Sequence, residues 1–314
     1  MIFQKVKILD RAKGALLATA VADALGAGYE FKAALADDVP VVFKAGLFDL
    51  GEYTDDTAQL LAVARAATRG DILENPDLVA EEFKLWYQSS PKDIGRQTRA
   101  VFANTDWSAA SLADSALTFL DANERAAGNG SLMRTAAIAL IYLDDPEKIT
   151  RAADLVSSLT HVDVDCREAC IIWSKAIRHA ILFENFDGIQ LAINELPAFR
   201  QTYWNGIFDE AEAAEQPADF SNNGWVIHAI QAAYKAVLMT ASENPNDLVR
   251  GIEAAVRCGN DTDTVAAIAG GLLGARWGLS AIPSDWLELV HGWPGYSRGD
   301  IEALAEAITE PVWL

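Results

Sequence analysis

The amino-acid sequence predicts an all-α fold, a single compact multi-helix domain that spans residues 1–314. Three observations lead to this prediction. Apolar residues recur at helical spacing along most of the chain, no segment alternates convincingly like a β-strand, and no repeat or long linker divides the sequence. About half of the residues are apolar (51%), which is enough material for a sizeable core.

The helical pattern is interrupted by turns and by prolines, which places each predicted element in order. Pro76, Pro146, Pro245 and Pro283 stand at or near predicted helix starts, where a missing N–H costs little. The short β-like run at residues 39–43 contains Pro40 and is predicted to be irregular. The predicted helices cover residues 12–24, 58–67, 76–87, 114–120, 133–142, 152–159, 169–183, 224–239, 245–257, 264–277, 284–289 and 300–308.

One predicted helix, at residues 264–277, is unusually rich in small residues. It contains the adjacent pair Gly270 and Gly271, although glycine inside a helix costs about 1 kcal/mol relative to alanine. Two adjacent glycines therefore indicate that another backbone approaches closely. We expect this helix to be central in the fold.

The charge balance restricts the class of partner. The chain carries 25 basic and 45 acidic residues, a formal net charge of −20, without a dense Lys/Arg cluster. A nucleic-acid partner is therefore not expected, because phosphate contact needs basic patches. A small anionic ligand remains compatible, since metal ions and backbone amides can supply local positive charge.

The sequence also predicts the compartment. No stretch resembles a signal peptide or a membrane span, so we expect a soluble, cytoplasmic protein. Cys166, Cys170 and Cys258 form a sparse, odd set that suits a reducing compartment. Cys166 and Cys170 could share a helical face, but without further metal ligands nearby we interpret them as packing residues.

Two acidic clusters stand at predicted helix starts: Thr54, Asp55, Asp56 and Thr57, and then the segment 261–264 with sequence DTDT. The simplest interpretation is that both are ordinary N-caps, which accept hydrogen bonds from free N–H groups. However, a cap needs one side chain, and each segment offers two carboxylates and flanking hydroxyls. If the helix starts face each other, the carboxylates require either raised pKa values or a hard cation such as Mg²⁺ or Mn²⁺.

Five blocks follow one another along the chain: DALGAGYEF at 23–31, TDDT at 54–57, PKDIG at 91–95, GNGSLMR at 128–134 and GNDTDTVAA at 259–267. Thr160 and His161 lie between the last two. This ordered set resembles the ADP-ribosylglycohydrolase family, which includes the dinitrogenase-reductase-activating glycohydrolases, and the resemblance extends from Asp10 to at least Gly278. It implies a fold of that type with a loop-borne binuclear metal site.

The resemblance implies a function for each block. Two Mg²⁺ (or Mn²⁺) ions would be bound by Thr54, Asp55, Asp56, Asp261, Asp263 and Thr264, with at least one bridging aspartate. The ions would hold ribose hydroxyls and orient a water that attacks the anomeric carbon, through a transition state of oxocarbenium character. Asp56 would thus also belong to the catalytic set.

Further residues acquire candidate roles by the same resemblance. Asp93 is the candidate general acid or base, although in isolation it would be interpreted as a helix cap. Glu30 would position substrate or water, although in isolation it would be a surface carboxylate. The remaining candidates bind substrate: Gly128, Asn129, Gly130 and Ser131 as a diphosphate loop with a helix start behind it, and His161 near the distal ribose. The alternatives for these are a plain turn and a structural histidine.

The chain departs from the family pattern at a few positions. Ala22 replaces a frequent glycine, Val164 a frequent proline and Gln59 a frequent methionine, and these changes are interpreted as structural. His228 stands where many relatives carry aspartate, which puts the substrate specificity in doubt. Tryptophans such as Trp86 and Trp225 could stack on adenine, although core packing is the default interpretation for each.

The sequence therefore predicts a metal-dependent hydrolase that removes ADP-ribose from modified protein side chains, with arginine linkage first. The predicted partner is an ADP-ribosylated protein or a small-molecule ADP-ribose adduct. The alternatives are hydrolysis of serine-linked ADP-ribose or O-acetyl-ADP-ribose, and a non-catalytic relative that acts as a binding or immunity protein.

Overall fold

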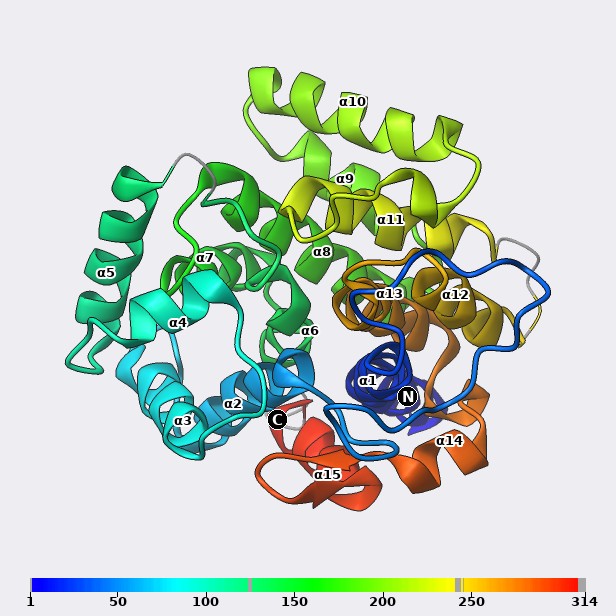
Figure 1. The fold of residues 1–314 in the computed structure, drawn as a ribbon. Coiled ribbons are helices and arrows are strands. Elements are labelled where there is room, and N and C mark those ends of the chain that lie inside the picture. Colours follow the sequence, from blue (N-terminus) through cyan, green and yellow to red (C-terminus); the bar gives the residue numbers. More distant parts are fainter. Residues whose placement is uncertain (1, 124–125, 241–243, 245, 310–314) are drawn as a thin grey trace.

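The computed structural model describes residues 2–123, 126–240, 244 and 246–309, and almost all regular structure in them is helical (Figure 1). The all-α prediction is confirmed. The α-helices are α1 Ile2–Gly26, α2 Asp55–Arg69, α3 Asp77–Gln88, α4 Arg96–Phe102, α5 Ala109–Ala122, α6 Ala136–Ile141, α7 Pro146–Ser158, α8 Val164–Phe183, α9 Gly188–Asn194, α10 Ala198–Ala213, α11 Val226–Leu238, α12 Asp247–Val256, α13 Thr262–Trp277, α14 Ser284–Leu289 and α15 Arg298–Thr309. Three short 3-10 turns (Leu132–Arg134, Pro217–Asp219 and Leu279–Ala281) and one hairpin, β1 His291–Gly292 with β2 Tyr296–Ser297, complete the described structure.

Helices α1 and α13 form the centre of the fold, where Figure 1 shows them side by side. Every residue of α13 from Thr262 to Ala275 is buried, as expected for a central helix. The glycines of α13 allow the close approach: a Cβ at Gly270 would lie 2.5 Å from the carbonyl oxygen of Ala18, and one at Gly274 would overlap the carbonyl oxygen of Gly14. The predicted packing reason for the glycines is thus confirmed.

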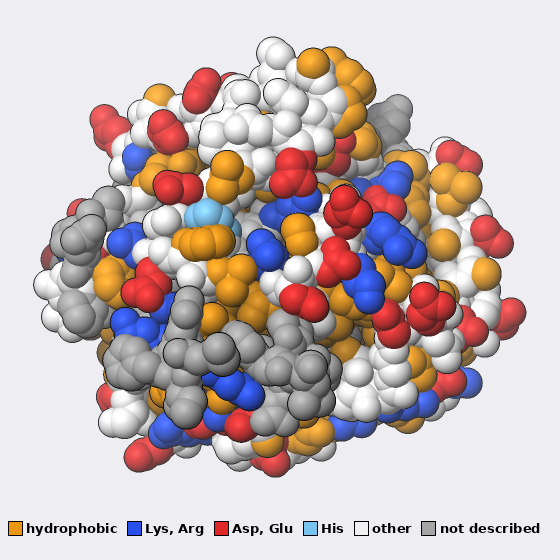
Figure 2. Space-filling view, turned by 180° about the vertical axis from the view of Figure 1, so that it is seen from behind, with side chains coloured by type: hydrophobic (Ala, Val, Ile, Leu, Met, Phe, Trp, Pro, Cys, Tyr) orange, Lys and Arg blue, Asp and Glu red, His pale blue; other side chains and the backbone are white. Residues whose placement is uncertain are grey.

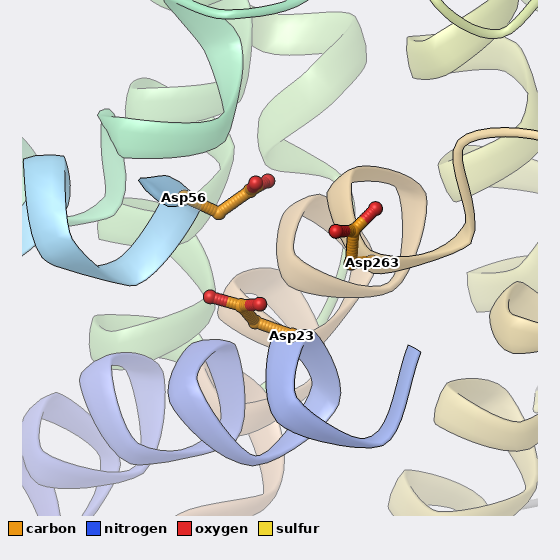
Figure 3. A group of neighbouring side chains, drawn as sticks. All are labelled: Asp23, Asp56 and Asp263. Atoms are coloured by element: carbon orange, nitrogen blue, oxygen red, sulfur yellow. The ribbon is translucent and has the colours of Figure 1, made fainter. Parts of the chain in front are cut away.

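The other helices surround this pair. Helices α8, α11 and α12 pack on α13, α15 packs on α1 and α2, and α10 lies on the outside against α9 and α11 (Figure 1). This arrangement brings the C-terminal end of α1 and the N-terminal ends of α2 and α13 together. These three ends carry Asp23, Asp56 and Asp263 (Figure 3).

Most predicted helices are present, with shifted ends. Helix α1 begins ten residues before its predicted start, and α7 and α8 begin several residues earlier than predicted. The helix predicted at 133–142 is a 3-10 turn followed by the six-residue α6. The predicted irregular run at 39–43 is confirmed, and Pro245 lies outside the described residues.

Three helices and the hairpin were not predicted. Helices α4 and α9 have seven residues each, too few to show a clear period. The longer α10 does carry a helical pattern, because its buried residues Trp204, Ile207, Phe208 and Ala211 are spaced three, one and three apart. The pattern is masked by exposed aromatic residues such as Phe199 and Tyr203 on the same helix.

Charged side chains of both signs lie on the surface, and the cysteines are buried. On the face opposite to that of Figure 1, Lys and Arg side chains are scattered among Asp and Glu (Figure 2). Cys166, Cys170 and Cys258 are buried free thiols. Among the described residues, no helix has both the length and the apolar character needed to cross a membrane.

Candidate metal centre and substrate cavity

A cavity of about 990 Å³ lies where the two acidic clusters meet. It is lined by segments far apart in the sequence, which the packing of α1, α2 and α13 brings together. The predicted site residues that line it are Glu30, Asp55, Asp56, Asp93, Gly128, Asn129, Gly130, His161, Asp261, Asp263 and Thr264. Thr54 and Ser131 are buried and do not line it.

The start of α2 is tied to the end of α1 by Asp23. The Asp23 carboxylate accepts hydrogen bonds from the backbone N–H groups of Thr54 (3.0 Å) and Thr57 (3.0 Å) and from the Thr57 hydroxyl (2.6 Å). Thr54 is the N-cap of α2, and its hydroxyl donates to Asp56 (3.1 Å). The cap interpretation therefore holds for Thr54, while the carboxylates of Asp55 and Asp56 remain available to the cavity.

The start of α13 lies directly against the end of α1. A Cβ at Gly26 would come within 2.5 Å of the Asp263 Cα atom, so only glycine permits this approach. Asp261 is the N-cap residue of α13 without a side-chain cap bond, and Asp263 lies in its first turn. Figure 3 shows Asp23, Asp56 and Asp263 reaching into one shared space from α1, α2 and α13.

The carboxylates form two groups that share a member. Asp23, Asp56 and Asp263 can each place one oxygen within 4.8 Å of the others, and the same is true of Glu30, Asp261 and Asp263. Asp263 belongs to both groups. The geometry thus contains the type of shared aspartate that could lie between two cations.

This density of carboxylates is unfavourable without a cation. Burial raises the pKa values of Asp56 and Asp263 well above the ordinary range, and repulsion from neighbouring carboxylates raises them further. Burial also raises the pKa of Asp23 to about 6 and, with repulsion from Asp261 and Asp93, that of Glu30 to about 8. One buried oxygen of Asp56, Oδ1, has no hydrogen-bond partner in the part of the chain that the structure describes. An all-oxygen donor set with an unpartnered buried oxygen fits a hard divalent cation.

The segment 126–130 forms part of the cavity wall, and Asn129 joins it to the acidic cluster. The Asn129 amide donates to Asp261 Oδ2 (2.8 Å) and to the carbonyl oxygen of Asn223 (2.9 Å). The side chain of Asn129 is therefore used to orient Asp261. Backbone groups of Gly128 and Gly130 remain on the cavity wall beside His161.

The structure modifies the expectation for Ser131. Its hydroxyl is fully buried beneath the loop, where it interacts with Ser157 (3.0 Å) and Cys170 (3.5 Å). The side chain is thus not brought into the cavity. The helix expected behind it is only a three-residue 3-10 turn, so a strong helix-dipole contribution at this loop is not supported.

Trp225 lies on the cavity wall, and His228 packs behind it. Trp225 lines the cavity and is 36% exposed, so the prediction that it packs in the core is wrong. The same prediction is confirmed for Trp86, which is buried in the core. His228 does not line the cavity. Its Nδ1 accepts a hydrogen bond from the backbone N–H of Asn222 (3.1 Å), and its ring packs against Trp225 (centroids 5.2 Å apart). His228 therefore supports the wall indirectly.

Asp23 is a site residue to which the sequence alone gives no role. It stands at the start of the block at 23–31. The available signal was its position as a lone carboxylate among the apolar residues Val21, Ala22, Ala24 and Leu25 of one helix, since a buried charge requires partners.

Comparison with known proteins identifies the family. The sequence model of the protein family described as ADP-ribosylglycohydrolase matches residues 4–313 of the chain. The chain belongs to the ADP-ribosylglycohydrolase family. The family consists of hydrolytic enzymes, so the prediction of an ADP-ribosyl hydrolase is confirmed at this level.

Individual relatives agree with this. The chain is 28% identical over 285 residues to the ADP-ribosyl-[dinitrogen reductase] glycohydrolase of Rhodospirillum rubrum, covering 88% of this chain and 89% of the relative. It is 29% identical to the ADP-ribosylarginine hydrolase Tri1 of Serratia proteamaculans (strain 568), covering 89% and 75%. Among solved structures, an ADP-ribosylglycohydrolase-related protein complex is similar with a TM-score of 0.71 and 29% identity, covering 97% and 98%.

Proposed function

We propose that this hydrolase removes ADP-ribose from arginine side chains of modified proteins, with two Mg²⁺ or Mn²⁺ ions as cofactors. The main support for this proposal is the presence of two clusters of three carboxylates that share Asp263. Asp263 lies on the wall of a cavity of about 990 Å³. That volume is within the range of cavities that hold ligands of drug size or larger. One relative, at 28% identity, is named for a modified protein, dinitrogen reductase. Another, at 29% identity, is named an ADP-ribosylarginine hydrolase, and that name favours arginine.

The residues fit the proposed ions. Asp55, Asp56, Asp261 and Asp263 would supply carboxylate oxygens, and Thr264 lines the same cavity. Thr54 would contribute its hydroxyl, which already contacts Asp56. When bound, such ions supply Lewis-acid polarisation of the ribose oxygens and of the attacking water.

The reaction transfers a hydroxyl group from water to the anomeric carbon while the bond from that carbon to the guanidine nitrogen breaks. The guanidine nitrogen receives a proton, so the products are ADP-ribose and free arginine side chain. We assign the proton transfer to Asp93, which lines the cavity and whose charge acts on both Glu30 and Asp55. Glu30 would position the substrate, and its raised pKa makes it the alternative proton carrier.

A hydrolysis assay tests the proposal. ADP-ribosylarginine protein is incubated with the enzyme, with and without a chelator, and released ADP-ribose is measured. We expect release with Mg²⁺ or Mn²⁺, loss with the chelator, and loss in Asp55→Ala and Asp263→Ala. Asp209→Asn, an exposed substitution on α10, serves as the matched control and should retain activity.

The alternatives give different results in the same assay. A panel with serine-linked ADP-ribose and O-acetyl-ADP-ribose identifies a hydrolase of another linkage, and human ADP-ribosylhydrolase ARH3 is a relative at 23% identity. Release from none of the substrates contradicts the enzymatic proposal and favours a non-catalytic binding protein. Such a protein should function equally well with Asp263→Ala.

A further inference from the structure

Arg134 is a fully buried cation that has no acidic partner among the ion pairs of the described residues. Its hydrogen bonds go to neutral groups: Nη1 donates to Gln59 Oε1 (2.7 Å), and Nη2 donates to the carbonyl oxygen of Val156 (2.8 Å) and to Thr160 Oγ1 (2.7 Å). Its buried Nε has no hydrogen-bond partner among the described residues. A buried charge that is paired with no carboxylate is costly, so its retention needs a reason beyond packing.

The hydrogen bond to Thr160 connects Arg134 with His161, which lines the cavity. Thr160 is buried, and its Oγ1 lies 2.7 Å from Nδ1 of His161. Since Thr160 Oγ1 accepts from Arg134, its own proton needs an acceptor, and among the described residues the acceptor within hydrogen-bond distance is His161 Nδ1. The hydroxyl therefore donates to the imidazole, and the imidazole hydrogen must be on Nε2.

The Nε2 edge of the ring faces the proposed substrate loop. A Cβ on Gly128 or Gly130 would lie 3.3 Å from Nε2, and all three residues line the cavity. Within the described part of the chain, Nε2 has no protein hydrogen-bond partner. Burial and the charge of Arg134 lower the pKa of His161 to about 3, so the ring is neutral at physiological pH.

We propose that Arg134 is a positioning residue that acts through Thr160: it holds His161 in the neutral tautomer with hydrogen on Nε2, and this N–H donates to an acceptor oxygen of the bound nucleotide sugar. The identity of that ligand rests on the proposed function. The tautomer does not, because it is set by protein groups alone.

Two chains of hydrogen bonds start at the Arg134 guanidinium. The Thr160 branch runs through Thr160 to His161, and the Asp55 branch runs through Gln59 to Asp55. Gln59 accepts from Arg134 through Oε1, which turns its amide nitrogen toward Asp55 Oδ2 (3.3 Å). Gln59→Met therefore removes the Asp55 branch and leaves the Thr160 branch intact, which makes it a matched control.

The experiment uses the 314-residue chain labelled with ¹⁵N-histidine, without metal or substrate. The chain has four histidines, and the spectrum of His161→Asn assigns the resonances of His161. Two-bond ¹H–¹⁵N spectra distinguish the two neutral tautomers. We expect His161 with hydrogen on Nε2 in the wild-type protein, in Thr160→Ser and in Gln59→Met, and a mixture or the opposite tautomer in Thr160→Val and Arg134→Met.

ADP-ribose binding, measured by calorimetry, gives the second readout. Thr160→Val should weaken binding roughly tenfold, the effect of one hydrogen bond, while Thr160→Ser restores it. The proposal is overturned by a wild-type His161 that carries hydrogen on Nδ1, or by an unchanged tautomer in Thr160→Val or in folded Arg134→Met. A tautomer shift in Gln59→Met also overturns it. If the expected tautomer is found but ADP-ribose does not bind the wild-type protein, the proposed function fails and the positioning role stands.

Discussion

Among single residues, Asp263 has the largest share in the acidic centre. It belongs to both groups of three carboxylates, so Asp263→Asn removes one carboxylate from each. We expect kcat/KM to fall by about 100-fold or more, and Mn²⁺ affinity to fall by about 10- to 100-fold. Hydrolysis kinetics and Mn²⁺ titration by electron paramagnetic resonance measure both. Unchanged Mn²⁺ affinity would contradict the assignment of Asp263 as a ligand.

His228 packs against Trp225, which lines the cavity. Its ring packs on Trp225 and Phe220, and its Nδ1 accepts from Asn222 N–H. His228→Asp can keep an acceptor for that N–H but loses the ring contacts. We therefore expect KM to rise by roughly two- to tenfold while Mn²⁺ affinity stays constant. A matching loss of Mn²⁺ affinity would show that His228 acts on the metal centre and not on the Trp225 wall.

At the residue scale, sequence reasoning could predict side chains with unusual local chemistry but not their tertiary partners. Asp55, Asp56, Asp261 and Asp263 carry more carboxylates than helix capping needs, which is visible locally. Asp23 accepts hydrogen bonds from Thr54 and Thr57, which lie 31 and 34 positions further along the sequence. The side chain of Asn129 contacts Asp261 across a separation of 132 positions. A local pattern of residue types cannot indicate contacts between residues so far apart in the sequence.

At the scale of elements, the approach of α1 to α13 decides whether the acidic helix ends can meet. The sequence predicted that α13 is central, because Gly270 and Gly271 are costly in a helix unless packing requires them. The partner helix and its contact points at Gly14 and Ala18 could not be predicted, since small residues tell that a neighbour is close but not which neighbour it is.

Two glycine substitutions test this contact. Gly274→Ala places a Cβ against the Gly14 carbonyl oxygen, so we expect a destabilisation of about 1–3 kcal/mol or more. Gly206 lies inside α10, and nothing lies within 4 Å of its ideal Cβ position. Gly206→Ala should therefore stabilise by about 0.4–1 kcal/mol. Urea unfolding measures both, and equal effects of the two substitutions would contradict the close contact.

At the scale of the whole molecule, we expect the acidic centre to link folding stability to pH and, through the proposed ions, to metal. The pKa of Glu30 rises from 4.5 to about 8 on folding, and that of Asp23 from 3.8 to about 6. For each group, at a pH between its unfolded and its folded pKa, the folded protein binds more protons than the unfolded chain. The stability contributed by these two groups is therefore fully present below their unfolded pKa values and is lost as the pH rises toward 8.

A divalent cation should reverse this dependence, because it binds the ionised carboxylates and releases their protons. We expect the unfolding free energy of the metal-free protein to fall from pH 5.5 to pH 8. Saturating Mg²⁺ or Mn²⁺ should raise it most at pH 8, by about 2.7 kcal/mol at one hundred times the dissociation constant. Urea unfolding with chelator or with metal at both pH values measures this, with Asp263→Asn expected to flatten both dependences. If the metal-free wild-type protein is instead as stable at pH 8 as at pH 5.5, the carboxylates do not repel one another as the packing of α1, α2 and α13 requires.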